Sequence, residues 1–205
     1  MASPAREMLT PAEAAVVANV RVRDVNRMID EHILPKACYR VDGGRWLRSD
    51  ACAYVSFYVH TAPVLTAEAR TNFIKWLSRP ARKNNFWVLS HHVSIDFAPF
   101  VGETDARRAK LEHAKDVVVE DPEILGGAPV LKGTRIPVHD IAANLAGGAA
   151  IEELLEDYPG LTAETIELAV LYAEANPLRG RPRKPLDPPG YVLLSKLGAA
   201  RRPGK

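Results

Sequence analysis

Turn-forming residues divide residues 117–176 into short pieces, and this pattern leaves the stretch few ways to fold. Asp121-Pro122, Gly126-Gly127 and Gly133 supply turn conformations that the interior of a strand or helix does not tolerate. Val130-Leu131 and Ile136-Pro137-Val138 flank the corner at Gly133, so we expect them to pair like the arms of a hairpin. The first half of the stretch is therefore predicted to hold only short extended pieces.

Three helices are predicted after this corner, at residues 138–146, 149–158 and 161–175. Thr162 is expected to cap the third helix, because its hydroxyl can accept a hydrogen bond from the first turn. The apolar stripe of this helix is expected to be buried and consists of Ile166, Ala169, Val170 and Ala173. The tight turn between the last two helices predicts a helix-turn-helix shape.

Residues 9–60 carry a second pattern of short helices, followed by a hairpin. Thr10 and Glu13 form a capping box with Pro11 at the first helical position, and Asn19 is expected in the turn that follows. The next helix is predicted to bury Val22, Val25, Met28 and Ile29 and to expose Arg23, Asp24, Asn26 and Arg27. Asp42-Gly43-Gly44 predicts a hairpin turn between two strands, and a further helix is expected over residues 49–58.

Residues 62–116 are predicted to connect these two regions. Thr66 is expected to cap a helix over residues 66–78. Aromatic and β-branched residues over 86–101 predict one or two strands, and residues 104–114 predict a charged helix.

Charge is segregated along the chain, although the 205 residues together carry only +2. Residues 114–177 hold three basic and twelve acidic residues, whereas residues 178–205 hold eight basic and one acidic. The C-terminal tail is also rich in proline and glycine, so it is predicted to be largely disordered until it meets a partner.

Neither a membrane span nor a catalytic motif stands out. No apolar run reaches the ~18 residues of a span and no signal peptide is recognisable, so we expect a cytoplasmic protein with Cys38 and Cys52 reduced. The sequence lacks a Walker loop, a nucleophile elbow and clustered metal ligands. We therefore expect no enzyme activity, no cofactor and no metal.

Two strings in the acidic region, DPEILGGAPVLKGTRIPV and EELLEDYPGLTAETIELAVLYA, resemble a small bacterial domain long catalogued as of unknown function. In that family the domain is associated with antitoxins of the VapB type. Such antitoxins pair with VapC-type PIN-domain ribonucleases. The resemblance therefore implies a toxin partner.

The N-terminal pattern resembles the winged helix-turn-helix of the MerR and excisionase families. By that resemblance the second helix would enter the major groove and the wing would reach phosphates. The candidate DNA-binding residues are Arg21, Arg23, Asn26, Arg27, Arg45 and Arg48. Arg21 departs from the Ser or Thr that more often caps such a helix. The alternative interpretation is that these arginines only solvate one face.

The basic tail admits two interpretations. Arg179-Gly180-Arg181-Pro182 resembles an AT-hook, a short segment that lies in the minor groove of A·T-rich DNA. Alternatively, the resemblance to VapB antitoxins makes it the toxin-neutralising segment, with an arginine entering the Mg²⁺-binding carboxylate pocket of the ribonuclease. The candidate toxin-binding residues are Arg179, Arg181, Arg183, Tyr191, Leu194 and Leu197.

These observations predict an α+β fold, mainly α, in four parts. They are a winged helix-turn-helix at 1–61, a connecting helix and strands at 62–116, a three-helix antitoxin domain at 117–177 and a basic toxin-binding tail at 178–205. The predicted function is a type II antitoxin that inhibits a VapC-type toxin. It is also expected to bind duplex operator DNA as a homodimer and to form a hetero-oligomer with the toxin. The alternative is a stand-alone DNA-binding regulator with an AT-hook-like tail.

Overall fold

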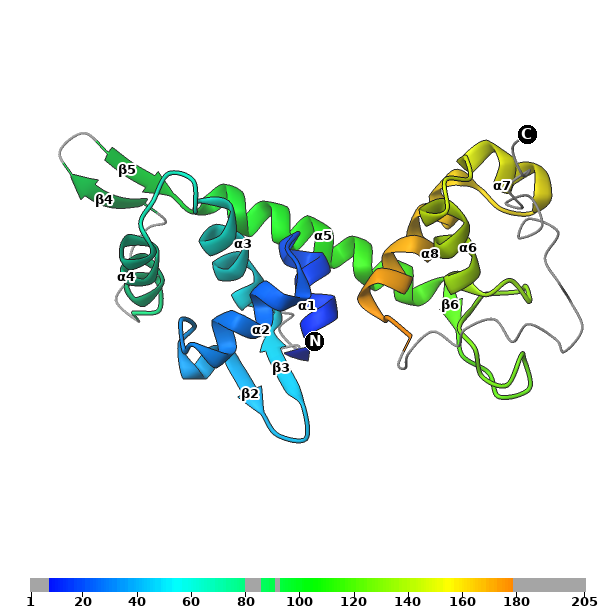
Figure 1. Cartoon of the computed structure of the whole chain (residues 1–205), viewed down its shortest axis with the longest axis horizontal. Coiled ribbons are helices and arrows are strands. Elements are labelled where there is room, and N and C mark those ends of the chain that lie inside the picture. Colours follow the sequence, from blue (N-terminus) through cyan, green and yellow to red (C-terminus); the bar gives the residue numbers. More distant parts are fainter. Residues whose placement is uncertain (1–7, 80–85, 91–92, 179–205) are drawn as a thin grey trace, which may run out of the picture.

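The computed structural model describes residues 8–79, 86–90 and 93–178. This part of the chain is mainly helical with a few short strands, as predicted. The long helix α5 (Ala98–Asp116) runs through the middle of the molecule (Figure 1). The N-terminal helices pack along one part of it, and the last three helices gather around its C-terminal end. Among these residues, no helix is both long and apolar enough to cross a bilayer.

The first helix begins and ends where the sequence predicts. In α1 (Pro11–Ala18), the backbone N–H of Glu13 donates to Thr10 Oγ1 at 3.2 Å, and Thr10 N–H donates to Glu13 Oε2 at 2.8 Å. This reciprocal pair confirms the capping box. Asn19 ends the helix in the left-handed region, with φ of 55°, and α2 (Val22–Asp30) starts three residues later. A short polar side chain tolerates that conformation better than most, so Asn19 fits the turn.

The faces of α2 differ from the prediction at two positions. Asp24, expected on the exposed face, is 8% exposed, and Val22, expected in the core, is 39% exposed. Asp24 lies one turn before the buried Met28 and so shares its inward side, whereas Val22 lies one turn before the half-buried Asn26. The helix is therefore rotated slightly from the orientation that its apolar residues alone suggest.

The N-terminal unit contains a three-stranded sheet of order β1-β3-β2, in which β1 precedes α1 whereas β2 and β3 follow α2. Its strands are β1 (Met8–Leu9), β2 (Tyr39–Val41) and β3 (Arg45–Arg48), all antiparallel. The β2–β3 hairpin confirms the predicted turn, in which Gly43 takes a φ of +60° that favours glycine. Leu47 is fully buried, so one face of the hairpin packs on the core and the other faces outward. Short 3₁₀ turns at Lys36–Cys38 and Ser49–Ala51 connect the hairpin to α2 and to α3 (Cys52–His60).

The connecting region contains α4 (Ala67–Leu77), β4 (Phe86–Ser90) and β5 (Val93–Asp96). Thr66 caps α4 by accepting a hydrogen bond from Ala69 N–H, as predicted. The predicted extension of the strands to residue 101 is wrong, because α5 already begins at Ala98. Pro99 occupies the first turn of α5 and Asp96 Oδ1 accepts from Ala98 N–H at 2.9 Å. These start signals outweigh the strand preference of the aromatic and β-branched residues that follow.

The C-terminal unit contains β6 (Val118–Val119), β7 (Val130–Leu131), α6 (Val138–Ala146), α7 (Ile151–Asp157) and α8 (Ala163–Ala175). The corner before α6 is confirmed: Val130 bridges Pro137, and Leu131 N–H donates to Ile136 O at 3.0 Å. Gly133 sits in this corner with φ of +77°. Thr162 caps α8 by accepting a hydrogen bond from Thr165 N–H at 3.1 Å. Of the expected stripe on α8, Val170 alone is only half-buried.

Two hydrophobic cores meet along α5. Leu111 of α5 belongs to the N-terminal core, where Phe57, Phe73 and Phe97 pack closely, and Ala114 belongs to the C-terminal core. Ala175, the last residue of α8, lies in the N-terminal core. The domain boundary expected at residue 116 therefore falls beside a helix that contributes to both cores.

Polar contacts add to this link. Lys115 Nζ lies 2.8 Å from Glu13 Oε1 of α1 and 3.1 Å from Glu112 Oε1, and these partners raise the Lys115 pKa although burial acts to lower it. The Tyr172 hydroxyl donates to Glu120 Oε1 at 2.7 Å. Burial, and then this hydrogen bond, raise the pKa of Tyr172. Helices α1 and α5 are thus held together by both apolar and polar contacts, and α8 is tied to the residue that follows β6.

Candidate nucleic-acid interface

The exposed face of α2 presents two guanidinium groups. Arg23 and Arg27 are both exposed and lie four residues apart, so they project from the same side of the helix. Within the described residues, neither forms an ion pair. Two unpaired cations one turn apart can contact phosphates or the acceptor atoms of guanine.

Asn26 lies on the same helix but faces a hollow rather than open solvent. Its Oδ1 is buried and has no hydrogen-bond partner in the described part of the chain. Asn26 lines a pocket of about 440 Å³ together with Val22, Arg45 and Pro177, which lies just beyond α8. The carboxamide is therefore less accessible than the sequence predicts, and its Oδ1 accepts no hydrogen bond from the described residues.

Arg21 occupies the N-cap position of α2 without a side-chain capping bond. Its Nε lies 3.5 Å from Asp24 Oδ2, and the Arg21 side chain is 71% exposed. The pairing explains how Asp24 can be buried, since an isolated buried carboxylate would be costly. Arg21 remains available for a second contact through the rest of its guanidinium.

The hairpin arginines are engaged within the protein. Arg45 donates to Asp30 Oδ1 from Nε at 3.2 Å and from Nη2 at 2.9 Å, so it ties the hairpin to the end of α2. Arg48 donates to Asp50 Oδ1 at 2.9 Å and to Ala37 O at 3.1 Å. The hydrogen bond to Asp50 raises the pKa of Arg48. Both positions were predicted to reach phosphates, but here their charge is largely neutralised by a neighbouring carboxylate.

Arg40 is a candidate residue that the sequence analysis missed. It is exposed on β2, directly opposite Trp46 in the hairpin register. Tyr39 pairs with the buried Leu47, so the alternation of a strand turns Arg40 to the outer face. This alternation was visible in the sequence and could have identified Arg40.

The surface of the C-terminal unit is acidic, in contrast to the exposed face of α2. Glu152, Glu153, Glu156 and Asp157 of α7 are all exposed, and so are Glu164 and Glu167 of α8. Lys110 of α5 lies 2.9 Å from Glu167 and neutralises only that carboxylate. An acidic surface of this kind repels phosphates, so the unit is poorly suited to hold DNA by itself.

The predicted toxin-binding residues lie outside the described residues. They are Arg179, Arg181, Arg183, Tyr191, Leu194 and Leu197. The described chain ends at Leu178, which is 71% exposed and follows the pocket that Pro177 shares with Asn26. The described part of the chain therefore ends beside α2.

Both cysteines are buried as free thiols. Burial raises the pKa of Cys38 to about 11 and also raises that of Cys52. A protonated thiol is a weak nucleophile and a weak metal ligand at neutral pH. Across the described ranges, no three His, Cys, Asp or Glu residues are grouped to hold a metal ion.

Comparison with known proteins gives one family model and one full-length relative. Residues 118–173 match the model described as "Protein of unknown function (DUF433)". The chain is 45% identical over 208 residues to "Uncharacterized protein y4eO" of Sinorhizobium fredii (strain NBRC 101917 / NGR234), an alignment that covers 96% of this chain and 94% of the relative. No solved structure matches the chain. The alignment with the relative thus spans both the N-terminal and the C-terminal unit.

Proposed function

Because the chain belongs to the same family as y4eO, over nearly the whole of both proteins, we propose one function in which both units take part. The protein is a cytoplasmic, DNA-binding antitoxin: it represses its own operon and neutralises a VapC-type PIN-domain ribonuclease. In this proposal α1, the Asn19 turn, α2 and the β2–β3 hairpin form a winged helix-turn-helix. Helices α6 to α8 form a helix-turn-helix-like domain used for folding and self-association.

The observation that carries the DNA-binding part is the pair Arg23 and Arg27, exposed and without ion pairs in the described residues. Placed in a major groove, each guanidinium can donate two hydrogen bonds to guanine O6 and N7. Arg40 on the outer face of the hairpin is suited to a flanking phosphate. A two-fold dimer would present two such helices to a palindromic operator.

Methylation interference tests this assignment. The full-length protein is bound to the duplex upstream of its own reading frame after sparse methylation of guanine N7, which lies in the major groove. We expect methylation to block binding at two clusters of guanines about one helical turn apart, since dimers of this type read half-sites at about 34–36 Å. Uniform binding to methylated and unmethylated DNA would contradict major-groove reading by α2.

The ribonuclease-binding part rests on the resemblance of the DPEILGGAPVLKGTRIPV string and on the excess of basic residues after residue 177. Two kinds of contact with the ribonuclease would have different roles: apolar residues would supply affinity, and an arginine would occupy the acidic pocket. The test is RNA cleavage by the PIN-domain protein of the neighbouring reading frame. Full-length protein should inhibit cleavage, and protein truncated after Pro177 should not. Full inhibition by the truncated protein would refute a neutralising tail.

A stand-alone regulator remains the second candidate, and one observation favours it. Pro177 lines the same pocket as Asn26 and Arg45, so the residues after it are joined to the chain beside the proposed DNA-reading helix. From that position Arg179-Gly180-Arg181-Pro182 could reach an adjacent minor groove. In this case truncation should lower the affinity for A·T-rich DNA and reduce its salt dependence, with no effect on a ribonuclease.

A further inference from the structure

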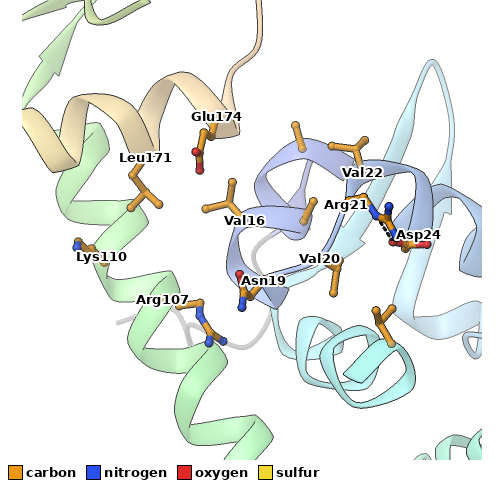
Figure 2. A pocket seen from close by; sticks show the side chains of 13 residues that line it. Val16, Asn19, Val20, Arg21, Val22, Asp24, Arg107, Lys110, Leu171 and Glu174 are labelled. Atoms are coloured by element: carbon orange, nitrogen blue, oxygen red, sulfur yellow. Dashed lines mark ion pairs between the residues drawn. The ribbon is translucent and has the colours of Figure 1, made fainter. Parts of the chain in front are cut away.

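A groove of about 840 Å³ lies between the α1–α2 turn, the start of α2 and helices α3, α5 and α8. Its volume falls within the ~300–1,000 Å³ typical of small-molecule sites. Most of the lining is apolar and comes from Ala15, Val16, Val20, Val22, Val59 and Leu171. Figure 2 shows Val16 of α1 and Leu171 of α8 pointing toward one another across it. A ligand in this groove would replace water on these apolar side chains.

Arg107 gives the groove an unsatisfied hydrogen-bond donor. Its side chain projects from α5 on the side of that helix that faces α1 (Figure 2). Arg107 Nη2 lies 3.2 Å from Glu103 Oε2, whereas Nη1 is buried and has no partner among the described residues. A buried charged donor without an acceptor carries a desolvation cost that a bound anion would remove.

The other charged residues of the lining are less suited to this role. Lys110 is paired with Glu167 at 2.9 Å, and Arg21 lies 3.5 Å from Asp24. Glu174 stands on the α8 edge and is exposed, so water weakens its repulsion of an anion. Arg107 is therefore the cation of the lining whose buried Nη1 lacks an acceptor in the described structure.

We propose that this groove binds a small organic anion with an apolar body and one carboxylate, which accepts a charge-assisted hydrogen bond from Arg107 Nη1. The apolar lining fits a hydrocarbon or aromatic body better than a phosphate-rich ligand. The single unsatisfied guanidinium nitrogen can donate a hydrogen bond to one carboxylate. This site does not depend on the proposed function, and its test contains no nucleic acid and no ribonuclease.

Calorimetry on the full-length protein tests the proposal with three carboxylate probes: octanoate, 4-phenylbutyrate and 1-naphthylacetate. Each is compared with the alcohol of the same carbon skeleton. We expect at least one carboxylate to bind one site per chain, about tenfold or more tighter than its alcohol, because a charge-assisted hydrogen bond is worth about that factor.

Two variants separate the site from general surface charge. Arg107→Gln should weaken the bound carboxylate about tenfold or more and remove its advantage over the alcohol. Arg135→Gln removes an exposed charge away from the groove and should leave binding unchanged. Circular dichroism of both variants monitors folding, and Arg107→Lys, which keeps a charge, should retain part of the preference. The proposal is overturned if no carboxylate outperforms its alcohol, or if Arg107→Gln and Arg135→Gln bind it equally well.

Discussion

Glu13 links the first helix to α5, and removing its buried carboxylate should be a costly change in the N-terminal unit. The residue is 9% exposed, and its carboxylate accepts from Thr10 N–H at 2.8 Å while Lys115 Nζ lies 2.8 Å away. Hydrogen bonds to charged groups contribute about 1.5–3 kcal/mol, and loss of a cap costs about 0.5–2 kcal/mol. Lys115 keeps Glu112 as a partner, so it is not orphaned. We therefore expect Glu13→Ala to lower the free energy of unfolding by about 2–4 kcal/mol.

Two companion variants separate the contributions. Glu13→Gln keeps an acceptor for Thr10 N–H but loses the ion pair, and should cost about 1–2 kcal/mol. Glu112→Gln removes the other partner of Lys115, a carboxylate that is 45% exposed, and should cost only about 0–0.5 kcal/mol because solvent screens it. Urea unfolding at pH 7, followed by far-ultraviolet circular dichroism, measures all three at comparable m-values. Equal costs for Glu112→Gln and Glu13→Gln would refute the reasoning.

Three further predictions concern single residues. Gly133→Ala should destabilise the protein by about 1 kcal/mol because Gly133 has a φ of +77°, although the space around it is open, whereas Gly102→Ala within α5 should stabilise it by about 0.5–1 kcal/mol. A thermal unfolding Tm that is higher for Gly133→Ala than for Gly102→Ala would contradict this. Tyr172→Phe should cost about 1 kcal/mol in chemical unfolding by removing the hydrogen bond to Glu120, and an unchanged midpoint would show that the bond is unimportant. Burial raises the pKa of Cys38 to about 11, so the folded state retains the thiol proton more strongly than the unfolded state. The resulting contribution to the free energy of unfolding should be present below pH 9 and lost toward pH 11. Alkylation of the native protein at pH 8 at the rate of the unfolded chain would contradict this prediction.

Local signals in the sequence predicted the local structure well. Thr10, Thr66 and Thr162 each accept the capping bond that the sequence indicates, because a cap depends on residues within one turn. Helix α6 has the predicted bounds, and Gly133 takes the positive φ expected of its corner. These features need no information about distant parts of the chain.

The remainder depended on contacts that sequence periodicity does not encode. Asp24 is buried because Arg21 neutralises it and because α2 is rotated on its neighbours. Arg45 reaches Asp30, fifteen residues away, rather than solvent, and this pairing requires the hairpin to fold back on α2. The groove at Arg107 is formed by five helices, so its lining is scattered through the sequence. Of the candidate DNA contacts, Arg23 and Arg27 are exposed as predicted, and neither has an ion-pair partner in the described structure.

Fluorescence anisotropy with the duplex upstream of the reading frame tests most directly whether α2 reads DNA. The parent is compared at one salt concentration with Arg23→Ala/Arg27→Ala and with Lys132→Ala/Arg135→Ala, which removes two exposed charges from the C-terminal unit. We predict that the first variant binds this duplex more weakly than the parent, since each base contact removed costs about 1–3 kcal/mol of discrimination, while the second binds like the parent. Parental affinity in the Arg23→Ala/Arg27→Ala variant, or equal loss in both, would contradict the account.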